Sequence, residues 1–165
     1  MELFEVLQKR RSVRRFTDEA VSKEDLDAMM HAAMSGPSAC NAKPWAFYAV
    51  EDASILQKLN NATNINAPLA IVVCGDLSKA MPSPLRDFWV QDCSAATENV
   101  LLAATALGLG AVWCGIYPVE QPVGNVREAL GLPDAIVPLN IVYIGHPAQT
   151  PEPRDQYDEG CVHIV

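Results

Sequence analysis

A cluster of cationic side chains stands close to the start of the chain. Five of the twelve Lys and Arg residues fall within positions 9–15, with a serine among them. They are Lys9, Arg10, Arg11, Arg14 and Arg15, together with Ser12. The planar donor fork of arginine matches phosphate oxygens, and a serine hydroxyl adds another donor. These cations repel one another, although the chain as a whole is acidic, with a formal net charge of −8. The cluster therefore needs a local counter-charge, and a phosphate group suits it best. Taken alone, the segment would also be explained as a solvated basic face.

The overall charge argues against nucleic acid as the source of that phosphate. The chain has 20 acidic residues and 12 basic ones, so it repels a polyanion at long range. Nucleic-acid binding depends on the opposite, attractive field. We therefore expect a small, buried anion.

A second segment suited to binding is PSACNAKPW, from Pro37 to Trp45. It joins a predicted helix to a predicted strand. Ser38 and Ala39 are small enough for the backbone to approach a flat ligand, and the Asn41 amide can both donate and accept hydrogen bonds. A helix end followed by a strand would account for the prolines, but it gives no reason for Asn41.

A third segment, AVWCGIYP, covers Ala111 to Pro118 and places Cys114, Gly115 and Ile116 where a strand enters a loop. Since Gly115 has no side chain, backbone amides there would face a ligand without obstruction. The same residues would equally form an ordinary β-bulge.

Arg154 is the only Lys or Arg after Arg127, and it lies in the proline-flanked sequence TPEPRDQY. Our interpretation is that it joins the early arginines around one anion. The alternative is a local ion pair with Glu152 or Asp155.

The other reactive residues do not form a catalytic or metal-binding set. The five cysteines are odd in number and widely spaced, and the three histidines share no ligand spacing. This pattern favours reduced thiols in a cytoplasmic protein over disulfides or zinc. No Ser-His-Asp, Cys-His or paired-carboxylate arrangement is indicated. Gly108 and Gly110 follow a helix, whereas the dinucleotide-binding glycines follow a strand.

Hydrophobic patterns predict the elements that position these segments. Helices are expected at 3–7, from Ser22 to about Gly36, at 55–59, from Asp87 to Leu107 and at 123–130; strands are expected at 45–50, 69–74, 111–117 and 138–145. The apolar run 69–74 predicts a central strand covered on both faces. Because helices and strands alternate irregularly, we expect an α+β fold with a mixed, mainly antiparallel sheet flanked by helices.

The length of 165 residues predicts a single domain, 1–165. No apolar run is long enough for a membrane span, and the N-terminus lacks the apolar core of a secretory signal. The helix at 87–107 is apolar almost all round, so it is covered either by a second subunit or, as a central helix, by the rest of a monomer. The proline-containing tail, about 146–165, is expected to run across a partner rather than fold back as a helix.

Taken in order, these segments resemble the FMN-dependent nitroreductase family, and the similarity covers nearly the whole chain. RRSVRRF resembles the family signature R-x-S-x-R-x-F, and PSACNAKPW resembles its A-P-S-x-x-N-x-Q-P-W segment. AVWCGIYP resembles the strand end that contacts the flavin. GHPAQTPEPRDQY, residues 145–157, resembles the closing glycine, prolines and phosphate-binding arginine.

The resemblance implies an intertwined homodimer with two FMN sites at the interface and exchanged C-terminal tails. By position, the residues that would hold the FMN phosphate are Arg10, Arg11, Ser12 and Arg154, with Arg14 near the ribityl chain or the ring. The residues that would line the isoalloxazine are Pro37, Ser38, Ala39 and Asn41. Backbone at Cys114, Gly115 and Ile116 would face its redox nitrogen. The resemblance assigns no catalytic side chain, since the cofactor carries the electron transfer.

The resemblance further implies an enzyme that uses NAD(P)H to reduce nitroaromatic, quinone or similar small acceptors by a ping-pong mechanism. The alternatives are a non-enzymatic flavin-binding sensor or storage protein and a flavin-dependent dehalogenase-like enzyme. Two features depart from the family pattern. Lys43 stands where the family usually has Gln, and the connection between the strand at Cys74 and the long helix is short, so the substrate pocket is expected to be open.

Overall fold

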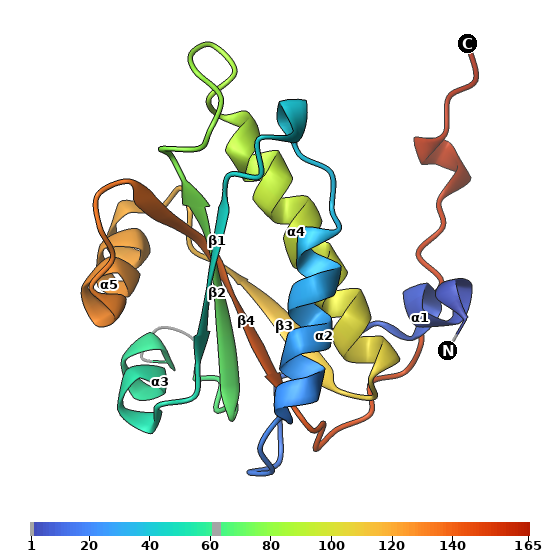
Figure 1. The fold of residues 1–165 in the computed structure, drawn as a ribbon. Helices are drawn as coiled ribbons and strands as arrows, with labels where there is room; N and C mark the ends of the chain where they lie inside the picture. The colour runs from blue at the N-terminus through green and yellow to red at the C-terminus, as the bar shows by residue number, and fades with distance from the viewer. Residues whose placement is uncertain (1, 61–63) are drawn as a thin grey trace.

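The computed structural model describes residues 2–60 and 64–165, and its centre is a four-stranded sheet in the order β1-β2-β4-β3 (Figure 1). The strands are β1 (Trp45–Val50), β2 (Leu69–Asp76), β3 (Gly110–Gly115) and β4 (Ile136–Gly145). Each neighbouring pair is antiparallel. The sheet thus differs from the mixed one expected, because β4 lies between β2 and β3, which run in the same direction. Within the described residues, parallel pairing occurs at one isolated bridge, Ser12 to Ala111.

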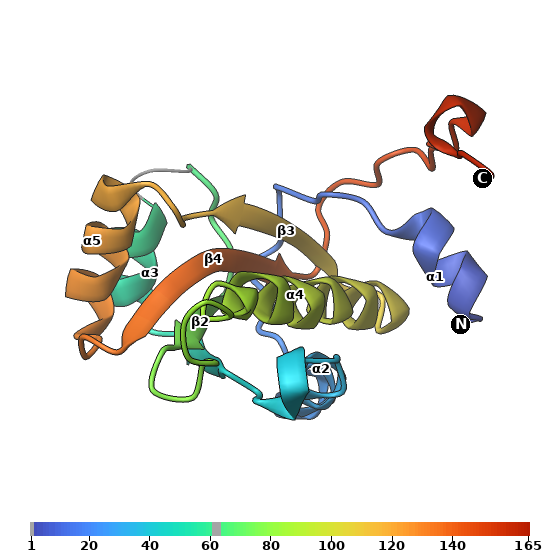
Figure 2. The same ribbon diagram turned by 90° about the horizontal axis from the view of Figure 1, so that it is seen from above.

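The described part of the chain contains five α-helices, of which the last four flank the sheet while the first stands apart from it (Figure 2). They are α1 (Leu3–Lys9), α2 (Lys23–Met34), α3 (Ala53–Asn60), α4 (Phe88–Ala106) and α5 (Glu120–Leu130). Two short 3₁₀ turns, η1 (Ala39–Asn41) and η2 (Glu159–Cys161), lie outside them. The fold is therefore α+β, and the positions of all nine predicted elements are confirmed to within a few residues.

The helices form one layer on each face of the sheet. Figure 2 shows α2 and α4 together on one side. Ile71 and Val73 of β2 pack with them in one core, while Ala70 and Val72 pack with α3 and α5 in the other. All eight residues of β2 are buried, because alternate side chains of a strand point to opposite faces and both faces are covered. The predicted central strand is confirmed.

Local signals define two of the helix ends. Ser22 Oγ accepts a hydrogen bond from the Asp25 N–H at 3.0 Å, as an N-cap does, so the predicted start of α2 is confirmed. At the end of α5, Gly131 adopts φ 61°, the left-handed conformation that glycine tolerates best.

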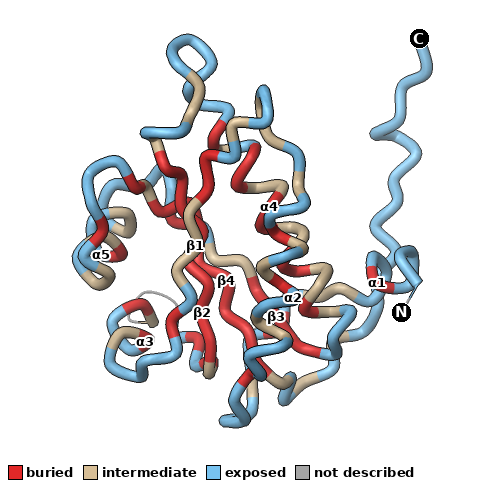
Figure 3. Tube along the Cα trace, in the orientation of Figure 1, coloured by how far each residue is buried: buried red, intermediate tan, exposed pale blue. Residues whose placement is uncertain are grey.

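The C-terminal tail leaves the body of the chain next to α1 (Figure 1). Beyond Pro151 every residue is exposed, and Figure 3 shows this segment as exposed along its length. Its regular structure is limited to η2. Ile164 is 96% exposed, and α1 also exposes Leu3, Phe4 and Leu7. A stretch this long makes few contacts with its own domain.

Across residues 2–60 and 64–165, no helix combines the length and apolar character needed to cross a membrane. The same residues contain no group of His, Cys, Asp or Glu side chains arranged to hold a metal ion. The five cysteines are free thiols.

Candidate functional site

The arginine segment is held against β3 immediately after α1. Val13 N–H donates to the Ala111 carbonyl at 3.0 Å, next to the bridge between Ser12 and Ala111. The Val13 side chain is buried and lies so close to Gly110 that a Cβ there would meet it at 2.7 Å. This contact fixes the backbone on which the neighbouring arginines are mounted.

The beginning of the tail lies alongside the end of the same segment. Thr17 N–H donates to the His146 carbonyl and Ala148 N–H donates to the Arg15 carbonyl, both at 2.9 Å. Phe16 and Pro147 form a second isolated bridge. These contacts bring two parts of the chain that are about 130 positions apart in sequence into register.

Between the two segments lies a groove of about 720 Å³, which we term the arginine groove. The cationic and hydroxyl side chains that line it are Arg10, Arg11, Arg14, Arg15, Arg154, Ser12 and Thr150. Tail residues 149–152 and Gln156 form its other wall. The late arginine and the early cluster thus line one hollow, as the sequence analysis expected.

Arg11 contains the clearest sign of a missing partner in this groove. Its Nε donates to the Glu152 carbonyl at 2.9 Å and its Nη1 donates to the Arg10 carbonyl at 2.8 Å. The remaining Nη2 is buried, and it has no acceptor among the described residues. Leaving a buried cationic donor unpaired is costly, so this atom marks a place for an anionic acceptor.

The other arginines differ in how they are engaged. Arg10 Nε lies 3.5 Å from Glu98 Oε1 on α4, and Arg15 Nε donates to Gln149 Oε1 at 3.0 Å. Within the described chain, the Arg14 and Arg154 side chains make no hydrogen bond or ion pair. Arg154 therefore does not pair with Glu152 or Asp155, the alternative left open by the sequence. Arg15 belongs to the predicted cationic cluster but was given no site role, and nothing in the sequence indicated Gln149, because only the fold shows that the tail pairs with this segment.

The end of β3 presents bare backbone. The N–H groups of Ile116 and Tyr117 both donate to the Leu139 carbonyl, so the regular ladder ends there. Within β3, Ala111 presents its carbonyl to Val13 at the open edge. Backbone groups of an antiparallel edge strand alternate between the neighbouring strand and that edge, so Gly115 has the same orientation as Ala111. The Gly115 N–H therefore points out from the sheet, and a Cβ on Gly115 would meet nothing within 4 Å. The Ile116 side chain is buried in the core, so Ile116 offers a ligand neither its amide nor its side chain.

Cys114 lies half-buried beside Gly115. Burial raises the pKa of its thiol, and the charge of Arg14 partly offsets that rise. The field of the arginine groove thus extends to the strand end.

The segment Pro37–Asn41 lies elsewhere on the same chain. It contains η1, and none of its residues lines the arginine groove. In Figure 2, α4 separates η1 from the segment that follows α1. One chain therefore brings together the predicted phosphate ligands but does not bring the predicted ring-lining loop to them.

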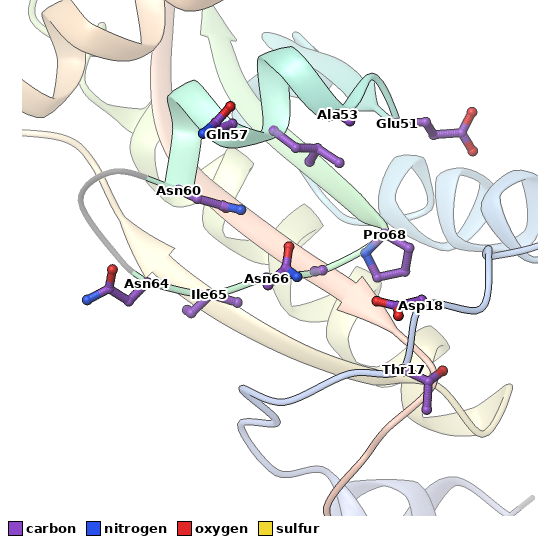
Figure 4. A pocket seen from close by; sticks show the side chains of 12 residues that line it. Thr17, Asp18, Glu51, Ala53, Gln57, Asn60, Asn64, Ile65, Asn66 and Pro68 are labelled. Carbon is purple, nitrogen blue, oxygen red and sulfur yellow. The ribbon is translucent and has the colours of Figure 1, made fainter.

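A second hollow, the amide pocket, has a volume of about 700 Å³ and lies between α3 and the segment 64–68 (Figure 4). Its polar walls carry Asp18, Glu51, Gln57, Asn60 and Asn66, and no Lys or Arg is among its described lining residues. The sequence analysis gave no signal for this pocket. Because it has carboxylates and no cation, it does not suit a phosphate.

Comparison with known proteins shows which family the chain belongs to. The model of the Nitroreductase family matches residues 7–80 and 57–146. A Methanothermobacter thermautotrophicus protein with the provisional name NADH dehydrogenase/NAD(P)H nitroreductase is 40% identical, over 99% of this chain and 87% of that protein. The chain belongs to the nitroreductase family.

Solved structures give the same result. A Parabacteroides distasonis protein with that same provisional name superposes with a TM-score of 0.91 at 38% identity, covering 98% of this chain and 96% of the other. An FMN-dependent nitroreductase of Clostridium difficile R20291 superposes with a TM-score of 0.88 at 30% identity, covering 98% of each chain.

Proposed function

We propose that this chain is an FMN-dependent oxidoreductase that uses NAD(P)H to reduce nitroaromatic, quinone or similar small acceptors by a ping-pong mechanism. Membership of the nitroreductase family makes the chain an oxidoreductase. The observation that supports FMN as the cofactor is the arginine groove, where Arg154 and the early cluster line one cavity.

The groove suits the phosphate of FMN. Arg10, Arg11, Ser12 and Arg154 would hold it, and the orphaned Nη2 of Arg11 is the donor most in need of such an acceptor. Charge-assisted hydrogen bonds of this kind are about twice as strong as neutral ones. Arg14 lines the same groove, and it would lie near the ribityl chain or the ring.

The strand end suits the flavin ring. FMN, when bound, supplies hydride and electron transfer. The outward N–H of Gly115 would donate to the ring, and the space beside Gly115 would let the ring approach the backbone. A backbone donor at that position would favour negative charge on the ring. Cys114 would contribute its backbone alone, and we assign no side chain as acid, base or nucleophile.

We further propose that two copies of the chain complete each site. The loop residues Pro37, Ser38, Ala39 and Asn41 would line the ring, but they lie across α4 from the arginine groove of their own chain. A partner's loop would fill that place. Exposed apolar side chains on α1 support a homodimer. The tail, 146–165, starts against its own chain, and its exposed part beyond Pro151 would continue over the partner.

The test is the colour of the purified protein and its response to a reductant. We expect a yellow protein with an FMN absorbance spectrum, which NADH or NADPH bleaches in the absence of oxygen and which a nitroaromatic or quinone restores. A colourless protein that does not take up added FMN would rule the proposal out. A yellow protein that reduces acceptors no faster than it reduces oxygen would instead support a flavin sensor or storage protein.

A further inference from the structure

The loop 37–43 follows an unusual backbone path. Cys40, Asn41 and Lys43 have φ angles of 49°, 56° and 51°. Residues other than glycine rarely adopt this left-handed region, and they remain there only when neighbouring contacts determine the conformation. In this loop three of four consecutive residues are left-handed, so contacts must hold the backbone in that conformation. Part of the support is internal, since Ser38 Oγ accepts the Lys43 N–H at 3.0 Å and the Ser38 carbonyl accepts the Asn41 N–H at 2.9 Å.

The contacts from outside the loop come from one short stretch of α4 and from β2. Asp92 Oδ1 accepts a hydrogen bond from the Ala39 N–H at 2.8 Å, at the start of η1. The adjacent Cys93 Sγ lies 3.8 Å from the Pro44 carbonyl, at the far end of the loop. The same carbonyl accepts the Asp76 N–H at 2.8 Å. The two ends of the loop are thus fixed to α4 and β2, and the left-handed residues lie between them.

Asp92 is an unexpected residue at this place. It is only 6% exposed, and burying a carboxylate costs free energy unless the surroundings compensate it. An apolar residue would fill the space at lower cost, and the neighbouring residues Trp89, Cys93 and Ala96 of α4 all belong to the apolar core. An apolar side chain, however, has no oxygen that could accept a hydrogen bond from the Ala39 N–H.

We propose that Asp92 is a positioning residue for the ring-lining loop. It fixes Ala39 so that Ser38 and Asn41 keep the geometry in which they contact FMN. This inference rests on the proposed function, since it concerns the same flavin site. It assigns Asp92 no contact with the cofactor and no role in proton transfer.

The experiment compares variants at position 92 by two readouts, neither of which is turnover. The first is hydrogen exchange of the backbone amides of residues 38–43 in the purified protein. The second is the FMN dissociation constant, measured by flavin fluorescence. Asp92→Ala removes the acceptor, and Asp92→Leu removes it while filling the volume, so a folded variant is available if the alanine variant does not fold. Asp92→Asn keeps an oxygen that can accept from Ala39.

We expect Asp92→Ala and Asp92→Leu to exchange the loop amides faster and to bind FMN about tenfold more weakly, the fold-change expected for one lost hydrogen bond. Asp92→Asn should match the wild type in both readouts. Val100→Ala is the control: Val100 is fully buried two turns further along α4, and that variant should lose stability with no change in loop exchange or FMN affinity.

The experiment separates a failure of the proposed function from a failure of the role proposed for Asp92. A wild-type protein that binds no FMN would overturn the proposed function and this inference with it. If the wild type binds FMN but Asp92→Leu keeps its loop exchange and its affinity, only the inference fails. Equal loosening of the loop in Val100→Ala would also overturn it, because the effect would then follow from general destabilisation.

Discussion

The arginine groove and the amide pocket differ little in volume, at about 720 and 700 Å³, but they differ in charge. Five arginines and one acidic residue, Glu152, line the first, whereas two carboxylates and several side-chain amides line the second. Each contains a buried polar atom without a partner among the described residues: Arg11 Nη2 in the groove and Asn60 Oδ1 in the pocket. The unpaired donor is cationic and the unpaired acceptor is neutral. Charge, not size, therefore makes the groove the hollow that better suits a phosphate.

The two hollows also differ in how they are assembled. The arginine groove joins a segment at positions 10–15 to a tail at 149–156, so it exists only while the tail is in place. The amide pocket is built mainly from α3 and the segment leading to β2. Changes in the tail should therefore disrupt one hollow and leave the other intact.

Removing the tail should have the largest effect, because it disrupts the arginine groove and leaves the amide pocket intact. Deleting residues 149–165 keeps the backbone bonds of His146 and Ala148 but removes Arg154 and one wall of the groove. We expect loss of bound FMN and a shift to a smaller species in size-exclusion chromatography. A shorter deletion, of residues 159–165, retains Arg154 and should retain the FMN phosphate contacts. An unchanged elution volume and flavin content in the longer deletion would contradict both the groove and the exchanged tail.

Single arginine changes should come next. Arg10→Ala or Arg154→Ala each removes a charge-assisted contact of about 1.5–3 kcal/mol, which corresponds to a roughly 10- to 150-fold weaker FMN affinity. Arg127→Ala is the matched control, since Arg127 pairs with Asp134 beside α5 and lies outside the groove. Gln57→Ala tests the amide pocket in the same titration. Full FMN affinity in both groove variants would show that the phosphate lies elsewhere.

Gly115→Val should disturb the ring end of the site while leaving the phosphate end intact. A Cβ at Gly115 meets nothing in the chain, so the fold should persist, and valine suits a strand. Any loss of FMN affinity then comes from overlap with the ring, at a cost of about 1–3 kcal/mol. Circular dichroism checks the fold and a fluorescence titration checks the affinity. Gly124→Val, at an equally open position in α5, should bind FMN like the wild type.

The smallest expected effect is a pH dependence of stability, and it arises from two thiols in the sheet core, outside both hollows. Burial raises the pKa of the Cys74 and Cys93 thiols to about 12. The unfolded thiols ionise near pH 9 while the folded ones stay protonated, so this contribution to stability is complete below pH 9 and is lost as the pH rises toward 12. Chemical denaturation at pH 8 and pH 10 should show a smaller decline for Cys93→Ala than for the wild type. Equal declines would mean that Cys93 is not shielded from solvent.

The elements with strong local signals could be predicted from the sequence. Ser22 followed by Asp25 gave the start of α2, the aromatic run gave β1 at 45–50, and the continuous apolar residues gave the central position of β2. In the site, the arginine cluster was visible because its charges are adjacent in sequence.

Apart from the meeting of Arg154 with the early arginines, the order of the strands and the individual long-range hydrogen bonds could not be predicted. The insertion of β4 between β2 and β3 makes the sheet antiparallel, and no local pattern encodes that order. The bond from Arg11 to Glu152 and the support of Ala39 by Asp92 join residues 141 and 53 positions apart. Asp92 stands in a helix whose pattern indicates only burial, so its hydrogen bond becomes visible only in the folded chain.

The most direct measurement of the central claim compares FMN with riboflavin, which has the same ring and ribityl chain but no phosphate. Both should be titrated into the apoprotein of the wild type and of Arg154→Ala. We predict that the wild type binds FMN far more tightly than riboflavin, and that Arg154→Ala narrows this difference by weakening FMN alone. Equal affinity of the wild type for the two flavins would contradict the account.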